Sequence, residues 1–127
     1  MKPRPVEYVD DYISGSAITI DINGTIKEAL NLMEKNHTDF LVVTKQDVPV
    51  FILKAYQAML KNPEDNIQSL VDEGKLEAAT IVESGSLWSN NVQKLKDTTV
   101  LIVADTTHPN PQLRGTISTY DLKIQKR

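Results

Sequence analysis

The chain contains no cysteine, and this absence excludes disulfide bonds, thiolate metal sites and cysteine nucleophiles. Its two histidines, His37 and His108, stand alone, without the spacing of a metal-ligand cluster, so we expect no metal. Walker, GxGxxG and GxSxG motifs are also missing. The carboxylates of Asp10, Asp11 and Glu83 are paired with no nucleophile or oxyanion donor and are interpreted as solvated charges near helix ends. We therefore expect no catalytic residue, no required cofactor and no enzyme.

Long apolar runs and blocks of basic residues are lacking as well. No window approaches the roughly 18 apolar residues of a spanning helix, and the N-terminus has no apolar stretch of signal-peptide length. The net charge is −3, from 17 acidic and 14 basic residues, with basic residues grouped only in the short tails. These absences predict a cytoplasmic protein without a membrane or a nucleic acid as partner.

What is present is the composition of an ordinary globular protein. The 127 residues are 40% hydrophobic and 24% charged, which suits one domain with a real core and is too short for two independent ones. Length and composition leave open whether the chain is a fragment of a larger protein.

The chain repeats itself at an interval of about sixty residues. The segment from Thr19 to Ile26 aligns without a gap with the segment from Thr80 to Leu87, and the same offset pairs 40–43 with 101–104. We therefore predict one module, 1–127, with a first repeat at about 6–61, a linker at about 62–76 and a second repeat at about 77–127.

Within the first repeat, apolar spacing predicts a strand, a helix, a hairpin and a second helix. The helix should begin at Thr25, because Thr25 and Glu28 have the form of a capping box. Two runs rich in branched residues, 40–43 and 48–53, are typical of a hairpin, and 55–60 resumes a helix. In the linker, 67–72 should form a short helix that ends near Gly74.

The second repeat predicts the same order, with a helix over 87–95, strands at 100–103 and 113–117, and a last helix from Thr119 onward. Asn90 and Asn91 replace small or apolar residues of the first helix, so this helix should turn a different face inward. Trp88, the single tryptophan, is either a core residue or an exposed contact for another chain.

A β-α-β-β-α unit that occurs twice resembles the pair of cystathionine-β-synthase (CBS) domains called a Bateman module, over nearly the whole chain from about Val6. The segments 9–13, 25–33 and 40–43 resemble its lead-in helix, first helix and central strand. The segment 115–122 resembles the more specific family pattern of Gly, two small or apolar residues, Ser or Thr, two variable residues and Asp. The resemblance implies an α/β (α+β) fold of two tandem repeats whose sheets pack with pseudo-two-fold symmetry.

In family members that bind adenosine compounds, the hydroxyl and carboxylate of this pattern hold the ribose, which implies Ser118 and Asp121 here. A carboxylate in the first turn of a helix suits such a role, because it accepts hydrogen bonds from both ribose hydroxyls. The alternative is a plain capping box from Ser118 to Asp121, useful without any ligand. Both interpretations stay open.

By the same resemblance, the ligand also contacts a group of residues of the first repeat: Ile18, Thr19, His37, Thr38, Asp39 and Phe40. The matching motif of the first repeat is lost, since Phe51, Lys54 and Gln57 stand where the pattern has Gly, a hydroxyl and Asp. We therefore expect at most one nucleotide site per chain.

Phosphate recognition is weakly supported, because the family's usual cations before the central strand are replaced by Thr98 and Thr99. Arg114, Lys54 or His37 are the substitutes, and Asp39 would oppose a polyanion. The resemblance thus implies a regulatory, ligand-sensing module for AMP, adenosine or an S-adenosyl compound, acting on an effector protein or domain. The alternative is a ligand-free module for dimerisation or protein interaction. A homodimer formed through helices is implied in either case.

Overall fold

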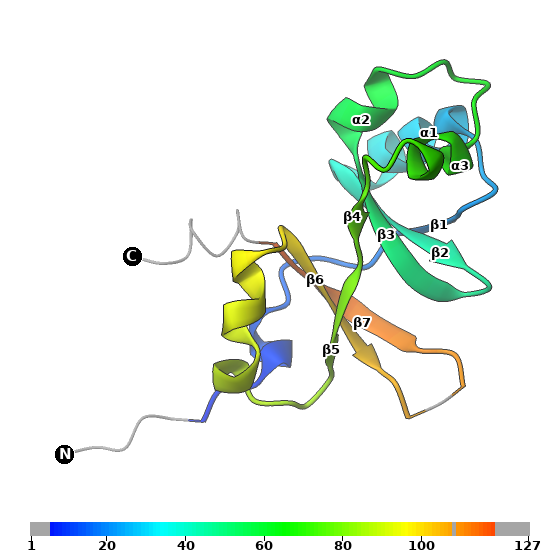
Figure 1. Ribbon diagram of the computed structural model, residues 1–127. Helices are drawn as coiled ribbons and strands as arrows, with labels where there is room; N and C mark the ends of the chain where they lie inside the picture. The colour runs from blue at the N-terminus through cyan, green and yellow to red at the C-terminus, as the bar shows by residue number, and fades with distance from the viewer. Residues whose placement is uncertain (1–5, 108, 119–127) are drawn as a thin grey trace. The chain divides into compact units, whose positions relative to one another are not determined.

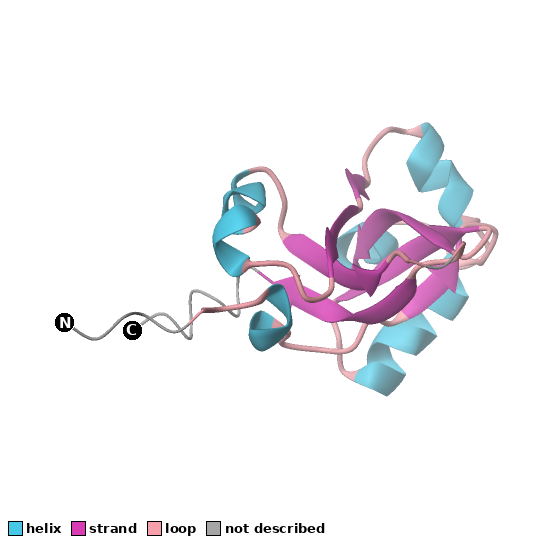
Figure 2. Cartoon of the chain, turned by 90° about the horizontal axis from the view of Figure 1, so that it is seen from below, coloured by secondary structure: helices cyan, strands magenta, loops and turns pink. Residues whose placement is uncertain are grey.

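The computed structural model describes residues 6–107 and 109–118, and these form two compact units. Unit 2 is the continuous segment Ile18–Ala79, whereas unit 1 combines residues 6–17 with residues 80–107 and 109–118 (Figure 1). The residues that precede the first strand of the first repeat therefore pack with the second repeat. The expected mixture of helices and strands is confirmed, and Figure 2 distinguishes the two by colour.

Unit 2 contains a four-stranded sheet in the order β1-β2-β3-β4, with β1 parallel to β2 and the other neighbours antiparallel. The hairpin between β2 and β3 is confirmed, and its turn places Gln46 and Asp47 in the left-handed region, as a two-residue turn of type I′ requires. The elements of unit 2 are β1 (Thr19–Asp21), α1 (Ile26–Asn36), β2 (Phe40–Lys45), β3 (Val48–Lys54), α2 (Ala55–Met59), α3 (Ile67–Asp72) and β4 (Glu77–Ala78).

Helix α1 begins where the capping box predicts. The Glu28 amide donates to Thr25 Oγ1 at 3.1 Å, and the Thr25 amide donates to Glu28 Oε1 at 3.4 Å, so two amides at the helix start are satisfied. The predicted linker helix is confirmed as α3, and Gly74 follows it with a φ of 69°, a conformation that glycine adopts without a steric penalty.

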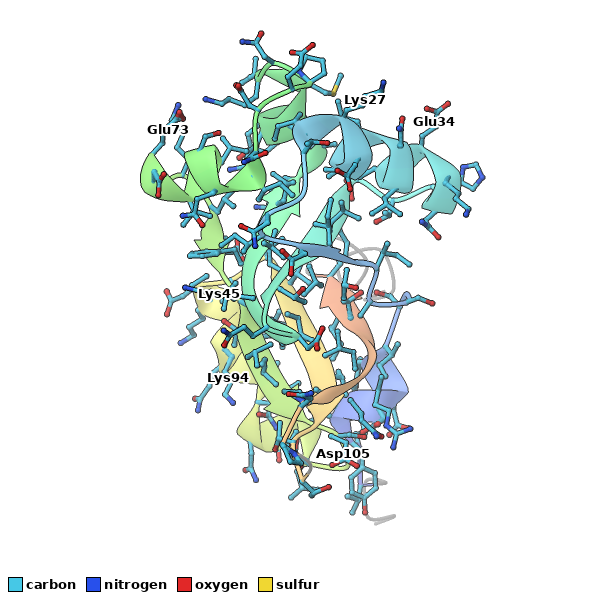
Figure 3. All side chains as sticks on the ribbon, turned by 90° about the vertical axis from the view of Figure 1, so that its right-hand side faces the viewer. Lys27, Glu34, Lys45, Glu73, Lys94 and Asp105 are labelled. Carbon is cyan, nitrogen blue, oxygen red and sulfur yellow. The ribbon has the colours of Figure 1, made fainter. Side chains whose placement is uncertain are left out.

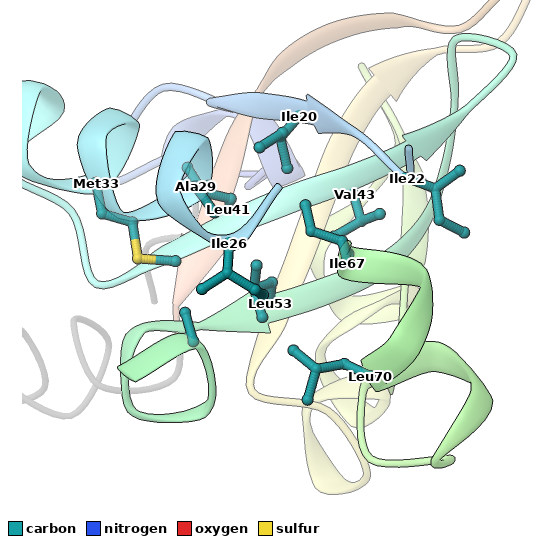
Figure 4. Packing of buried hydrophobic residues seen from close by; sticks show 11 residues of the cluster. Ile20, Ile22, Ile26, Ala29, Met33, Leu41, Val43, Leu53, Ile67 and Leu70 are labelled. Atoms are coloured by element: carbon teal, nitrogen blue, oxygen red, sulfur yellow. The ribbon is translucent and has the colours of Figure 1, made fainter. Parts of the chain in front are cut away.

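The core of unit 2 lies between its helices and one face of its sheet. Figure 4 shows apolar side chains from α1 and α3 pointing toward those of the strands. Residues of β2 alternate, so Leu41 and Val43 belong to this core while Val42 points to the other face. On the outer face of α1, the exposed Lys27 and Glu34 project away from the sheet (Figure 3). The buried members of the core are Ile20, Ile22, Ile26, Ala29, Met33, Leu41, Val43, Leu53, Ala58, Ile67 and Leu70.

Unit 1 contains a three-stranded sheet in the order β5-β6-β7, with β5 parallel and β7 antiparallel to β6. Its core is smaller, with Val9, Val82, Leu101, Val103 and Ile117 buried. The described elements are the 3-10 helices η1 (Val9–Tyr12), η2 (Trp88–Asn90) and η3 (Val92–Lys96), with β5 (Thr80–Glu83), β6 (Val100–Asp105) and β7 (Gln112–Ser118).

The prediction of an α-helix over 87–95 was wrong, because this stretch forms η2 and η3 instead. Asn91 gives the physical reason. Its side-chain amide is buried and donates to the Leu87 carbonyl at 2.7 Å and to Ser86 Oγ at 3.0 Å, so it competes with the backbone bonds of an α-helix. The last predicted helix, from Thr119 onward, lies outside the described residues.

Candidate functional site

Two of the predicted ligand residues lie where the chain enters β1 of unit 2. The Ile18 carbonyl accepts a hydrogen bond from the Val42 amide at 2.9 Å, and Thr19 is paired with Val42 in the parallel ladder. Ile18 is half-buried and Thr19 is exposed. Because β1 and β2 are parallel, the residues that precede these two strands lie at the same edge of the sheet, the one where both strands begin.

The other four predicted contacts in this unit form the turn that enters β2. His37 ends α1 in the left-handed conformation, with a φ of 52°, and its side chain is exposed. Thr38 Oγ1 donates to the Phe40 carbonyl at 3.2 Å, and the Asp39 carbonyl accepts from the Ala55 amide at 2.7 Å. Phe40 is half-buried and the Asp39 side chain is exposed. The structure thus brings all six residues of the first repeat to one edge of the unit 2 sheet.

Lys54 lies at this edge too, because it is paired with Phe40 across β2 and β3. Its ammonium group forms an ion pair with Glu77 at 3.5 Å. Gln57, which replaces the motif carboxylate in this repeat, accepts a hydrogen bond from the Lys54 amide at 3.0 Å and donates one to the Lys75 carbonyl at 2.9 Å. Both altered motif positions therefore bind the segment around β4: Lys54 through its ion pair with Glu77, and Gln57 through its hydrogen bond to Lys75.

In unit 1, Ser118 is the last residue of β7, is half-buried and is paired with Val100. Asp121, the predicted ribose carboxylate, lies outside the described residues. Gly115 and Ile117 of the same motif are fully within the strand and buried. The alternative of a capping box between Ser118 and Asp121 falls on the same undescribed stretch.

Arg114 does not lie beside Ser118. Its guanidinium is 3.8 Å from the Asp105 carboxylate, at the hairpin end of β6 and β7. Arg114 and Ser118 are four steps apart along an extended strand, a span of roughly 13 Å. Of the two weak phosphate candidates, Lys54 and Arg114, each is therefore engaged with a carboxylate of its own unit.

Sequence reasoning missed the role of Asp10, which was interpreted as a solvated charge. Its carboxylate accepts hydrogen bonds from the Ser84 hydroxyl and the Gly85 amide, each at 2.6 Å. Desolvation raises the pKa of this carboxyl, but the bonds from Ser84 and Gly85 and the charge of Arg114 outweigh it and lower the pKa below its ordinary value. No local pattern signals these contacts, because the partners are far apart in the chain.

Two other side chains, those of Glu83 and Trp88, have specific partners that the sequence did not reveal. Glu83, also interpreted as solvated, accepts hydrogen bonds from the amide and the hydroxyl of Thr106 at 3.1 and 2.6 Å. Trp88 is partly buried against the core of unit 1 and stacks on Tyr12, with ring centroids 4.2 Å apart and planes inclined by 20°. Trp88 thus contributes to packing in this unit.

The described residues contain no group of three or more His, Cys, Asp or Glu side chains that could hold a metal ion. Among the same residues, no helix is long and apolar enough to cross a membrane.

No protein-family model matches the chain, and no curated protein matches it in sequence. Solved structures do match it in three dimensions. The CBS domains of a transcriptional regulator from Streptococcus pneumoniae superpose with a TM-score of 0.67 at 19% identity, covering 94% of this chain and 99% of that one. The CBS domain pair of protein MJ0100, solved with 5′-methylthioadenosine and S-adenosyl-L-methionine, gives 0.64 at 16% identity, covering 95% and 96%.

A third structure, the cytosolic domain of the Mg²⁺ channel MgtE in complex with ATP, superposes with a TM-score of 0.71 at 12% identity. It covers 94% of this chain, which spans only 48% of that domain. At these identities the likeness establishes the fold alone.

Proposed function

Because the chain has the fold of a CBS domain pair, we propose that it is a regulatory module that binds a small adenosine-type ligand: AMP, adenosine or an S-adenosyl compound. The observation that carries the proposal is the placement of the motif residues, with Gly115 inside β7 and Ser118 at its end. A structural neighbour of the same fold was solved with S-adenosyl-L-methionine and 5′-methylthioadenosine, and another with ATP, which supports the same class of ligand.

The proposal assigns the ribose to Ser118 and Asp121, whose hydroxyl and carboxylate suit a sugar diol. It assigns the adenine to the edge of unit 2, where Ile18 and Phe40 offer half-buried apolar surface beside backbone groups. Thr19, His37, Thr38 and Asp39 complete this edge.

One ligand per chain is the expected stoichiometry. In the first repeat, Lys54 and Gln57 stand where the motif has a hydroxyl and a carboxylate, and both are engaged with the chain at Lys75 and Glu77. A ribose would have to displace these interactions and would find no carboxylate in return. These contacts favour a structural role for the altered motif of the first repeat, in place of ligand binding.

A ligand with little or no phosphate fits the charges better than ATP does. Lys54 and Arg114 are each paired with a carboxylate, while Asp39 presents an exposed negative charge at the edge of unit 2. Adding a polyphosphate there would cost Coulomb energy, and both Lys54 and Arg114 would have to leave their carboxylate partners to offset it.

The direct test is calorimetric titration of the full chain with adenosine, AMP, ADP, ATP and S-adenosylmethionine. The expected result is binding of one ligand per chain that Asp121→Ala abolishes. Asp72→Ala is the matched control, because Asp72 is an exposed carboxylate at the end of α3 and should leave the heat unchanged. Binding that survives in Asp121→Ala would contradict the proposed ribose site, and no heat with any of the five ligands would contradict the sensing function.

A second candidate function, a ligand-free interaction module, is favoured by a cluster of exposed apolar side chains on and after α2. Tyr56, Met59 and Leu60 are 62%, 71% and 82% exposed. Large apolar side chains grouped on a surface are typical of protein contacts. Under this function the chain forms a homodimer through its helices or binds an effector protein without any small molecule.

Light scattering tests the homodimer independently of ligand binding. If the cluster forms a homodimer, the wild-type chain has twice the monomer mass and Met59→Glu is monomeric at the same concentration. Lys27→Glu is the matched control, because Lys27 is exposed on the outer face of α1. A monomeric wild-type chain would contradict the homodimer.

A further inference from the structure

Residues 6–17, here called the strap, belong to unit 1 although they lie at the start of the first repeat, before its first strand β1. At its first end the strap forms an antiparallel bridge between Tyr8 and Leu87. The Val9 amide donates to the Ser86 carbonyl, and the Trp88 amide donates to the Glu7 carbonyl, both at 2.9 Å. This end of the strap is therefore held by backbone bonds that do not depend on side-chain identity.

Side chains add three further attachments at this end. Val9 is fully buried in the core of unit 1, and the rings of Tyr12 and Trp88 are stacked. The Asp10 carboxylate accepts the bonds from the Ser84 hydroxyl and the Gly85 amide. Because Val9, Tyr12 and Ile13 all pack on the small core of unit 1, its hydrophobic stabilisation depends on the strap.

The second end of the strap covers β7, which is an edge of its three-stranded sheet. The Ser14 amide donates to the Thr116 carbonyl, and the Thr116 amide donates to the Gly15 carbonyl, both at 2.9 Å. Thr116 thus directs both backbone groups to the strap, two residues before Ser118. Without the strap these groups would belong to an open sheet edge.

The space around Gly115 shows how closely the strap approaches β7. A Cβ at this position would lie 2.5 Å from Ile13 Cγ2 and 2.8 Å from the Gly15 carbonyl oxygen, both of which belong to the strap. The glycine of the motif is therefore required here by the strap itself, whether or not a ligand is present.

Unit 2 has a counterpart to the strap in the chain from residue 65 to β4. There the Ile67 amide donates to the Gly24 carbonyl at 3.0 Å, the Ile26 amide donates to the Asp65 carbonyl at 2.8 Å, and the edge strand β4 covers β3. β4 forms two ladder pairs, whereas the strap meets β7 in one bridge, between Gly15 and Thr116. At β7 the strap therefore forms fewer pairs than β4 forms at β3.

We propose that docking of the strap is a reversible conformational switch that sets the order of the C-terminal end of β7 and, through Ser118, the affinity of the adenosine site. The second clause rests on the proposed function, and the first does not. A ligand that prefers the ordered strand binds the docked state more tightly and so favours docking, and by linkage a release of the strap weakens the ligand. Chain segments joined to residue 6 would thereby be coupled to the ligand.

The first arm of the test is hydrogen exchange of the ligand-free full chain by NMR. Asp10→Ala removes the acceptor for Ser84 and Gly85 and is expected to speed exchange of the Thr116 and Ile117 amides by about tenfold, while amides of β2 and β3 keep wild-type rates. Fluorescence of Trp88, the single tryptophan, should change in parallel as Tyr12 leaves it. Asp72→Ala is the control. If the Asp10 variant unfolds unit 1 entirely, Asp10→Asn, which keeps the side-chain size, replaces it.

The second arm measures ligand affinity in the same variants. The expected result is a Kd raised in inverse proportion to the docked fraction of each variant, which its Trp88 fluorescence reports. Faster exchange of the strap amides with unchanged protection at Thr116 and Ile117 would overturn the first clause. A clearly lower docked fraction with an unchanged Kd would overturn the second. Absence of ligand binding in the wild-type chain would overturn the proposed function and the second clause but leave the result of the exchange arm decisive for the switch.

Discussion

The Asp10 carboxylate and the Ser84 hydroxyl lie 2.6 Å apart, although 74 positions separate these residues in the chain. This contact joins the N-terminal segment to the turn that follows the first strand of the second repeat. Gly85, the next residue, adopts a φ of 83° and donates its amide to the same carboxylate. One distant side chain therefore helps to hold a turn that the Ser86 amide also closes by donating to the Glu83 carbonyl at 3.1 Å.

The pH dependence of stability should show this contact. The pKa of Asp10 is below its ordinary value of 3.8 in the folded chain, so the ionised carboxylate stabilises unit 1 fully above that pH. The contribution is lost as the pH falls below 3.8 through the folded pKa. Urea unfolding from pH 7 to pH 2.5 should show a smaller acid loss in Asp10→Asn than in the wild type. Equal losses in both proteins would contradict the assignment.

Gly115→Ala should destabilise unit 1 by about 1–3 kcal/mol, because the new methyl group overlaps Ile13 and the Gly15 carbonyl and something must shift. The change is read from urea unfolding followed by Trp88 fluorescence. Gly15→Ala is the matched control, since the nearest atom to its Cβ, Thr116 Oγ1, is 3.9 Å away. A fully stable Gly115→Ala would show that the strap is not held as described.

Leu53→Ala should lower the free energy of unfolding by about 2–5 kcal/mol, because Leu53 is fully buried in the core of unit 2 and its loss leaves a cavity. Chemical denaturation followed by circular dichroism measures the loss. Leu60→Ala, at a side chain that is 82% exposed, should change the stability of the monomer by no more than about 0.5 kcal/mol.

Thr25→Ala should cost about 1 kcal/mol, because the Glu28 amide loses its acceptor at the start of α1. Thr25→Ser keeps a hydroxyl at the same place and should retain most of the stability. Thermal unfolding of the three proteins side by side gives the comparison. If serine and alanine are equally destabilising, the loss comes from packing of the threonine methyl group and not from the cap.

Local signals in the sequence predicted much of unit 2. The cap at Thr25, the hairpin around Gln46 and Asp47 and the linker helix α3 were all predicted, because each depends on residues within a few positions of one another. The helix over 87–95 was not, because the buried side chain of Asn91 satisfies backbone groups that an α-helix would use. Periodicity alone does not reveal that competition.

The candidate site divides in the same way. The repeat and the family pattern selected Ser118 together with Ile18, Thr19 and residues 37–40, and the parallel pairing of β1 and β2 places the residues of the first repeat at one sheet edge. The partners of Lys54 and Arg114 were not predictable, since an ion pair depends on which carboxylate the fold brings near. Asp121 lies outside the described residues and stays a prediction.

By itself the sequence determined the order of strands and helices in unit 2, the cap at Thr25 and the turn at Gln46 and Asp47, because these follow from interactions between residues close in the chain. Only the tertiary structure decided that the strap joins the second repeat, that Asp10 closes the turn at Ser84, and that the altered motif of the first repeat attaches the chain at Lys75 and Glu77. The physical reason is that these contacts join groups far apart in sequence, and only the packing of whole units brings them within hydrogen-bonding distance.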